Sequence, residues 1–207
     1  YAIGCTLHLI AKEAAPHTTA LVYLVREHGF NAYHEGKRRQ EDVEECFSLV
    51  MKYLSDEIRG KMTLEENRII SCTCGYRNEG KSKSCILAGG FHKLQEETIS
   101  GSKCDKCGRQ LHQRFQWKFM GEFVIVVMPR FNADKTKNSR ALTIPTVWGD
   151  LVAAIVHVGP TIHSGHYVTF VRDPTSLNWT KWNDTWSSTE NGGNALKEIS
   201  TGGYLLV

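Results

Sequence analysis

Residues 156–170 read VHVGPTIHSGHYVTF, and a second segment, WNDTW, follows at residues 182–186. Both contain strand-forming residues, and a turn-forming stretch separates them. His166 directly precedes the first predicted strand, while Asn183 ends the second and is followed by Asp184. Two neighbouring strands of this kind can set an imidazole beside an amide or a carboxylate. In chemical terms, this is the general base and the orienting group of a cysteine-protease triad.

The composition is that of a soluble globular protein with one large domain or two small ones. The chain has 207 residues, of which 41% are hydrophobic and 23% are charged. These values exclude disorder, collagen and coiled coil. The best apolar runs, residues 124–128 and 151–156, have strand length and are too short for a membrane helix. We also see no signal peptide at the N-terminus.

The order of the predicted elements favours an α+β fold. Apolar residues recur at helical spacing over residues 5–15 and again from about residue 41 to residue 58. From residue 63 onward, short β-like runs alternate with Gly, Asn and Ser clusters, and helices followed by a mostly antiparallel sheet define this class. The predicted strands are Arg68–Cys72, Cys85–Ala88, Gln110–Phe119, Phe123–Met128, Val152–Val158, Tyr167–Arg172, Trp179–Asn183 and Gly203–Val207.

Four of the seven cysteines have the spacing of a zinc site. Cys72 and Cys74 form a C-x-C pair, Cys104 and Cys107 form a C-x-x-C pair, and a glycine follows each pair. Zinc prefers four thiolates in a tetrahedron, and such knuckle turns often require a positive φ at the glycine. The predicted Zn²⁺ would be structural, because four thiolates leave no open position for a substrate or water. Four buried, reduced cysteines are the alternative.

The cysteines also indicate the cellular compartment, and they raise a second class of function. An odd number of cysteines with metal spacing is typical of a reducing environment, so we expect an intracellular protein. A zinc ribbon with flanking lysines is also found in nucleic-acid binders. The net charge of +3 is too mild to support that function, and we do not expect nucleic acid as a partner.

Several segments together resemble the ubiquitin-specific protease family, the papain-like deubiquitinases. GHYVTF and WNDTW resemble the catalytic box near the family's C-terminal end, and the other boxes occur in the family's order over nearly the whole chain. These are IGCTLHLI at residues 3–10, QEDVEECFSLVMKYL at 40–54, CTCG at 72–75, CDKCG at 104–108 and VIVVMPRFN at 124–132.

The resemblance implies a single catalytic domain, residues 1–207, with the papain-like cysteine protease fold. Its parts would be a helical thumb at about 1–62, zinc-ribbon β fingers at about 63–122 and an antiparallel β palm at about 123–207. The implied activity is hydrolysis of the isopeptide or peptide bond after the C-terminal Gly-Gly of ubiquitin. Ubiquitin and ubiquitinated proteins would be the partners, and no membrane is involved.

The resemblance also assigns catalytic roles. Cys5 would be the nucleophile at a helix N-terminus, and His166 would serve as base and then as acid. Asn183 would orient His166, while Asp184 would add negative charge near the imidazolium.

Substrate contacts follow from the same resemblance. Asp42 and Glu45, one helical turn apart, would accept hydrogen bonds from the ubiquitin tail, and Tyr167 would pack on its terminal Gly-Gly. His157 and His163 either line the loop over the tail or lie at the surface.

Other functions remain open at this stage, because the cysteine box Ala2-Ile3-Gly4-Cys5-Thr6 departs from the family pattern. The chain could be a papain-like protease for another ubiquitin-like modifier or for a polyprotein junction. It could also be a catalytically dead member that only binds ubiquitin, or, more remotely, a zinc-ribbon nucleic-acid module.

Overall fold

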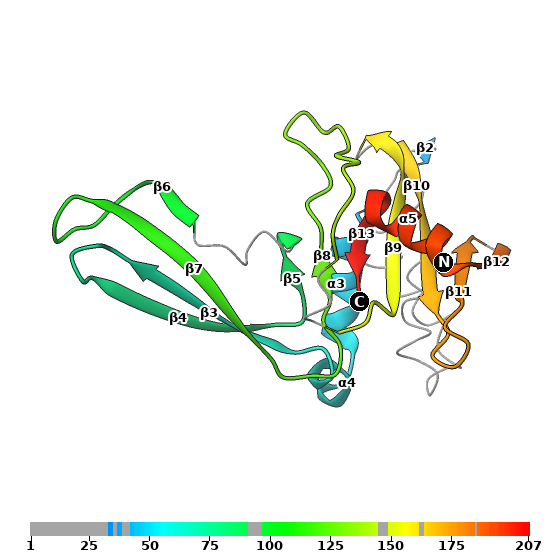
Figure 1. Ribbon diagram of the computed structural model, residues 1–207, viewed down its shortest axis with the longest axis horizontal. Coiled ribbons are helices and arrows are strands. Elements are labelled where there is room, and N and C mark those ends of the chain that lie inside the picture. The colour runs from blue at the N-terminus through cyan, green and yellow to red at the C-terminus, as the bar shows by residue number, and fades with distance from the viewer. Residues whose placement is uncertain are drawn as a thin grey trace.

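The computed structural model describes residues 33–34, 37–38, 42–90, 97–144, 149–161, 164–184 and 186–207. Within these residues the strands form a seven-stranded sheet, a four-stranded sheet and a two-stranded ribbon, which consists of β1 (Tyr33–His34) and β2 (Lys37–Arg38). The four-stranded sheet projects from one side of the seven-stranded sheet (Figure 1). The predicted α+β class is confirmed, whereas the predicted helix at residues 5–15 lies outside the described residues.

The seven-stranded sheet has the order β12-β11-β10-β9-β13-β8-β5, and among these strands only β5 and β8 pair in parallel. The last strand in the chain, β13, therefore lies in the middle of the sheet. Its strands are β5 (Leu87–Ala88), β8 (Val126–Val127), β9 (Ala153–Thr161), β10 (Ser164–Arg172), β11 (Trp179–Asn183), β12 (Trp186–Glu190) and β13 (Gly203–Leu206).

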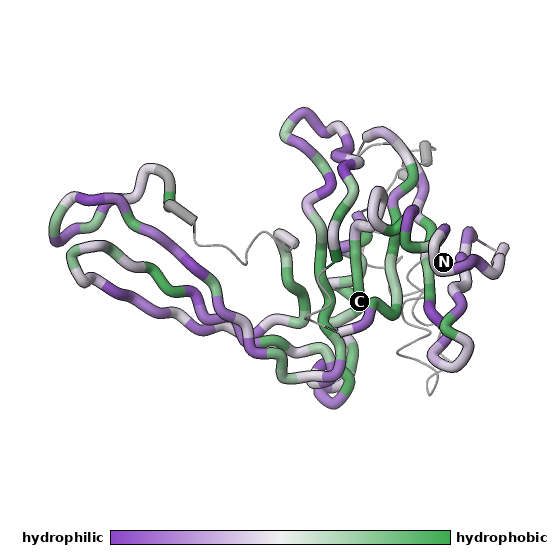
Figure 2. The backbone as a smooth tube through the Cα atoms, viewed as in Figure 1, coloured by the Kyte–Doolittle hydropathy of each residue, from purple (hydrophilic) through white to green (hydrophobic). Residues whose placement is uncertain are grey.

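One helix covers each face of this sheet (Figure 1). On the face of α5 (Gly192–Gly202), Phe170 and Trp179 pack against Ile199 of the helix. On the other face, Phe47 of α3 (Val43–Tyr53) packs against a cluster that includes Ile155, Leu205 and Tyr204. Figure 2 shows that hydrophobic residues concentrate in the strands between the two helices. The inner strands β8, β9 and β13 are thus largely buried between the two helices, whereas the outer strand β12 is exposed.

The four-stranded sheet has the order β4-β3-β7-β6 and is antiparallel throughout the described strands. Figure 2 shows that it is largely hydrophilic, and every residue of β4 is exposed. Phe115 and Trp117 stack at 6.0 Å between ring centroids, as alternate residues on one face can. Its strands are β3 (Leu64–Ser71), β4 (Arg77–Ser84), β6 (Glu97–Lys103) and β7 (Gln110–Phe119).

The predicted continuous helix over residues 41–58 is wrong, because two helices separated at Leu54 and Ser55 take its place. The chain leaves the helical conformation at Leu54, which has ψ of 149°, and a second helix, α4 (Asp56–Gly60), follows. Ser55 caps this second helix by accepting a hydrogen bond from the Ile58 N–H at 3.4 Å. A serine before two acidic residues is a helix start, and here it overrides the apolar periodicity.

Two predicted strands, Gln110–Phe119 and Trp179–Asn183, coincide with β7 and β11. The sequence patterns did not predict β4, β6, β12 and α5, which have few apolar residues or begin with glycine. β5 lies within the predicted fingers range but pairs with β8 in the seven-stranded sheet. No helix among the described residues is long and apolar enough to cross a membrane.

Candidate active site

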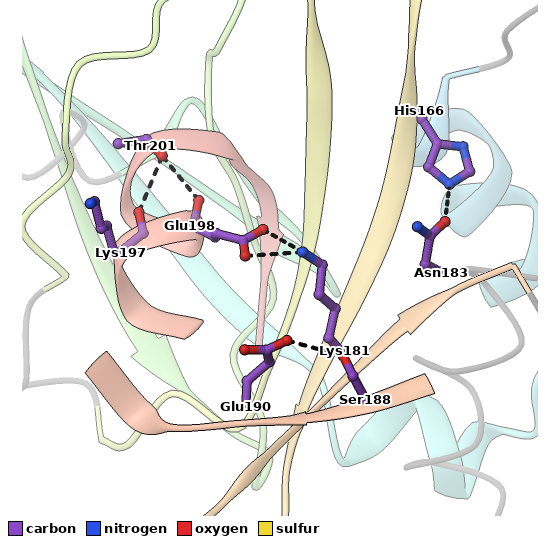
Figure 3. Close-up of polar contacts among 8 residues, drawn as sticks. All are labelled: His166, Lys181, Asn183, Ser188, Glu190, Lys197, Glu198 and Thr201. Atoms are coloured by element: carbon purple, nitrogen blue, oxygen red, sulfur yellow. Dashed lines mark hydrogen bonds and ion pairs between the residues drawn. The ribbon is translucent and has the colours of Figure 1, made fainter. Parts of the chain in front are cut away.

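His166 and Asn183 form a short hydrogen bond at one end of the seven-stranded sheet. Nε2 of His166 lies 2.6 Å from Oδ1 of Asn183, and Figure 3 shows the two side chains pointing toward each other from β10 and β11. Because the amide oxygen can only accept, Nε2 must carry the proton. Nδ1 is then the nitrogen that can take a proton from a thiol. The structure therefore brings together the predicted base and its orienting group.

Asp184 lies just beyond the end of β11 and turns back toward the same imidazole. Its φ of 52° is in the left-handed region, which aspartate tolerates better than most residues. Its Oδ2 lies 3.8 Å from Nε2 of His166, farther than a hydrogen bond but close enough for a charge interaction. Asp184 therefore lies near the imidazole as a charge, while Asn183 makes the direct contact.

Two glycines allow β9 and β10 to approach closely beside His166. Gly159 and Gly165 have φ of 147° and 156°, and the pairing register shifts between Ser164 and His166. A Cβ built on Gly165 would lie 2.5 Å from Nε2 of His157 and 2.5 Å from the Val158 carbonyl oxygen. No side chain fits there, so the irregularity that precedes His166 requires glycine.

His157 is buried in β9, so its predicted place at the surface or in the loop over the tail is wrong. It is 0% exposed, and neither ring nitrogen has a hydrogen-bond partner. Its ring contacts Phe131 edge-on at 5.2 Å and Tyr167 at 5.0 Å between centroids. Burial, together with the positive charge of Lys137, lowers the pKa of His157 to about 4. The imidazole is thus a neutral member of an aromatic cluster, next to the strand that carries His166.

Asp42 caps α3 and is bound to the rest of the fold. Its Oδ1 accepts hydrogen bonds from the backbone N–H groups of Glu44 at 2.7 Å and Glu45 at 3.4 Å. Its Oδ2 accepts a hydrogen bond from the Tyr204 hydroxyl at 2.9 Å. Burial and the adjacent Asp42 carboxylate raise the pKa of Tyr204. No sequence pattern indicated that Tyr204 and Asp42 form a hydrogen bond. This hydrogen bond gives the carboxylate of Asp42 a structural role.

Of the other predicted substrate contacts, Glu45 and Tyr167 lie within the described residues and differ in exposure. Glu45 is exposed in the first turn of α3, and Tyr167 is half-buried with its ring 6.1 Å from that of Tyr204. Burial, with the charges of Asp42 and Glu45, raises the pKa of Glu44, which indicates a concentration of negative charge at this helix end. His163 and Cys5 lie outside the described residues.

Arg130 is a buried arginine that no sequence pattern indicated as a site residue. It is 2% exposed and donates from Nε to the Gly203 carbonyl at 2.9 Å and from Nη1 to the Arg140 carbonyl at 2.7 Å. Nη2 donates to the carbonyl of Ser200 in the last turn of α5, where a cation also suits the helix dipole. Arg130 therefore joins α5, β13 and the segment after β8.

An ion pair lies two residues before Asn183. Lys181 Nζ contacts both carboxylate oxygens of Glu198, at 2.7 and 3.0 Å (Figure 3). The same Nζ lies 5.4 Å from the centre of the Phe170 ring. The pair links β11 to α5. Alternation along a strand puts Lys181 on the same face as Asn183, so this link also fixes the strand that carries the Asn183 amide.

The four predicted zinc ligands converge at the far end of the four-stranded sheet. The sulfurs of Cys72, Cys74, Cys104 and Cys107 all lie within 4.8 Å of one another. Sulfurs at 2.3 Å from a tetrahedral zinc would be about 3.8 Å apart, so these positions fit the ion. Both knuckle glycines have the predicted positive φ, 90° at Gly75 and 69° at Gly108. The cluster can therefore hold a metal ion, as the spacing predicted.

A family model described as ubiquitin carboxyl-terminal hydrolase matches residues 17–207. The match covers most of the chain, and the protein belongs to this family of ubiquitin hydrolases. The resemblance found in the order of the sequence boxes is thereby confirmed. Cys5 precedes the matched residues, so its role does not follow from the match.

Solved structures with the same fold include the SAGA DUB module of Ubp8, Sgf11, Sus1 and Sgf73 bound to ubiquitin aldehyde. The chain is 16% identical to that structure with a TM-score of 0.69, covering 91% of this chain and 53% of that one. The module bound to monoubiquitin is 16% identical with a TM-score of 0.68, and the match covers 91% of this chain and 52% of that one. A yeast SAGA DUB module gives 16% identity, a TM-score of 0.62, and coverage of 81% and 45%.

The chain therefore spans about half the length of the solved structures it matches. At this identity the likeness establishes the fold alone, and this fold agrees with the α+β class expected from the sequence. None of the curated proteins gave a significant match.

Proposed function

We propose that this protein is a thiol-dependent deubiquitinase that hydrolyses the bond after the C-terminal Gly-Gly of ubiquitin. The observation that carries the proposal is the 2.6 Å contact between His166 Nε2 and Asn183 Oδ1. It selects the imidazole tautomer in which Nδ1 can accept a proton, as a thiol protease requires. Membership of the ubiquitin carboxyl-terminal hydrolase family supplies the substrate class.

In the proposed reaction, Nδ1 of His166 takes the proton from the thiol of Cys5. The thiolate attacks the carbonyl of the last ubiquitin glycine, and the imidazolium returns the proton to the leaving amine as the amide bond breaks. Water, deprotonated by the same imidazole, then hydrolyses the thioester and releases ubiquitin and the thiol. Asn183 keeps the ring oriented. The negative charge of Asp184, whose Oδ2 lies 3.8 Å from Nε2 of His166, favours the imidazolium that forms during both acylation and hydrolysis of the thioester.

The acidic end of α3 is the proposed contact for the basic ubiquitin tail. Glu44 and Glu45 lie in the first helical turn, and Glu45 is exposed. Since both oxygens of Asp42 have protein partners, we assign Asp42 to building this acidic turn and Glu45 to direct contact. The half-buried ring of Tyr167, next to His166, would cover the terminal Gly-Gly, where a larger residue would not fit. His163 would line the loop above it.

The four-stranded sheet is proposed to hold the globular part of ubiquitin. Cys72, Cys74, Cys104 and Cys107 would bind one structural Zn²⁺ at its end, and a closed shell of four thiolates supplies folding free energy without taking part in the reaction. In this scheme the thumb, fingers and palm are about residues 1–62, 63–122 and 123–207. The free cysteines suit a reducing, intracellular compartment.

A ubiquitin probe with a C-terminal electrophile tests the proposal directly. Covalent capture of the wild-type chain, lost in Cys5→Ala, is the expected result. Capture only by a probe made from another ubiquitin-like modifier would mean that this modifier, and not ubiquitin, is the substrate. Tight, non-covalent binding of ubiquitin without capture would mean a binding protein and would contradict the enzymatic proposal.

A further inference from the structure

Trp186 is the most exposed large hydrophobic residue in the described part of the chain, with 81% of its surface open to solvent. It lies on β12, the outer strand of the seven-stranded sheet, where its register partner is Asn183. Directly opposite residues of an antiparallel pair point to the same face. The indole therefore stands on the face of the sheet that carries Asn183 and, through the hydrogen bond, His166.

The sheet order decides which side of the reaction this indole faces. β12 is at the edge opposite β5, and β5 follows β4 of the four-stranded sheet almost directly in the chain. In Figure 1 the four-stranded sheet projects from the β5 side, while β12 lies at the other end of the molecule. If the four-stranded sheet holds ubiquitin, its tail reaches His166 from the β5 side. The polypeptide that carries the modified lysine then leaves on the side of β12.

We propose that Trp186 binds this leaving polypeptide, with the aliphatic stem of the modified lysine packed on the indole. The inference rests on the proposed function and adds a contact on the far side of the scissile bond. An indole offers a large, rigid apolar surface, and its face attracts the ammonium group that cleavage produces. In the intact substrate Nζ is an uncharged amide, so the contact is that of the apolar stem with the indole, and covering about one methylene in this way changes binding by about fivefold. Trp186 is thus a specificity-determining residue for the acceptor protein rather than for ubiquitin.

Two substrates that share ubiquitin but differ beyond the scissile bond provide the test. One is ubiquitin joined through an isopeptide bond to a short lysine-containing peptide, and the other is ubiquitin with a small thioester leaving group. Trp186→Ala is expected to lower the ratio of their kcat/KM values, peptide over thioester, by about fivefold. Trp186→Phe, which keeps an aromatic face, is expected to lose less.

Leu196→Ala is the matched control, since it removes another exposed apolar side chain, 46% exposed, from α5. It should keep the wild-type ratio. An unchanged ratio in Trp186→Ala, including an equal loss on both substrates, would overturn the assignment of Trp186. Failure of the proposed function has a different signature, because wild-type protein would then turn over neither substrate, and both proposals would fall.

Discussion

The hydroxyl of Tyr204 donates a 2.9 Å hydrogen bond to Oδ2 of Asp42 and so joins the central strand β13 to the cap of α3 across 162 positions of the chain. The same carboxylate holds the first turn of α3 through its other oxygen. One side chain thus connects the helix that carries the acidic turn to the sheet that carries His166.

Removing the Tyr204 hydroxyl should therefore reduce stability. Because the acceptor is a carboxylate and Tyr204 is buried, we expect Tyr204→Phe to lower the free energy of unfolding by about 2 kcal/mol. Urea denaturation measures the change, with Tyr76→Phe, in the turn between β3 and β4, as the matched loss of a hydroxyl. If the two variants are equally stable, the Asp42 contact contributes nothing to the fold.

Cys5 is predicted to be the sole nucleophile. Cys5→Ala should abolish turnover of a fluorogenic substrate built on the ubiquitin C-terminus, while ubiquitin binding, measured by calorimetry, persists. Cys85→Ala serves as the control, since Cys85 is a half-buried free cysteine outside the metal cluster. Loss of activity in Cys85→Ala or Cys46→Ala with activity kept in Cys5→Ala would show that the nucleophile is another cysteine.

Asn183 and Asp184 are predicted to share the task of orienting His166. Each alanine substitution should slow kcat, Asn183→Ala more than Asp184→Ala because only Asn183 makes the 2.6 Å contact. The double variant should lose far more than either single variant, within the ~10²–10⁴ range typical of such groups. The measurement is kcat at neutral pH for variants whose folding has been checked by circular dichroism. Near-normal turnover in the double variant would refute the shared role.

One zinc ion per chain is expected at the four-cysteine cluster. Elemental analysis of the purified protein should give a ratio near one, and Cys104→Ala should lower both this ratio and the melting temperature, because structural zinc contributes folding free energy. The melting temperature of Cys85→Ala should stay much closer to that of the wild type. A metal-free preparation with unchanged stability would mean that the cluster is not a zinc site.

His157 should make the fold sensitive to acid. Its pKa is about 4 in the folded protein and near 6.5 when unfolded, so the unfolded chain binds the proton more readily. This contribution to stability is complete above pH 6.5 and is lost as the pH falls toward 4, by at most about 3 kcal/mol. His157→Gln should therefore flatten the stability profile between pH 6.5 and 4 relative to wild type. Parallel profiles would show that His157 does not titrate with folding.

Local patterns were enough to predict the parts of the molecule that depend on near neighbours. The alternation of apolar and polar residues over Gln110–Phe119 predicted β7, and the strand predicted to end at Asn183 is β11. The cysteine spacing gave the metal cluster because each knuckle is closed by its own backbone, as in the 2.7 Å hydrogen bond from the Gly108 N–H to the Cys104 carbonyl. His166 and Asn183 were paired correctly because a short connection makes their strands adjacent.

The contacts that were missed depend on the whole fold. Nothing near Tyr204 in the sequence indicates Asp42 as its acceptor, since β13 must first insert beside β9. The burial of His157 required knowing that β9 is covered on both faces, and a histidine between glycine-rich turns is more typical of a surface. β12 is an edge strand of polar residues after Trp186, so its pairing with β11 leaves little trace in hydrophobicity.

The central place of β13 also has a consequence for how the chain acquires its structure. β5 and β8 on one side, and β9 to β12 on the other, are connected in the sheet only through β13. On a translating ribosome these two groups of strands emerge first and present unpaired strand edges and apolar side chains to solvent until residues 203–206 follow. The sheet can therefore close only after synthesis has passed Leu206. Until then the nascent chain exposes surfaces that chaperones bind and through which it can aggregate.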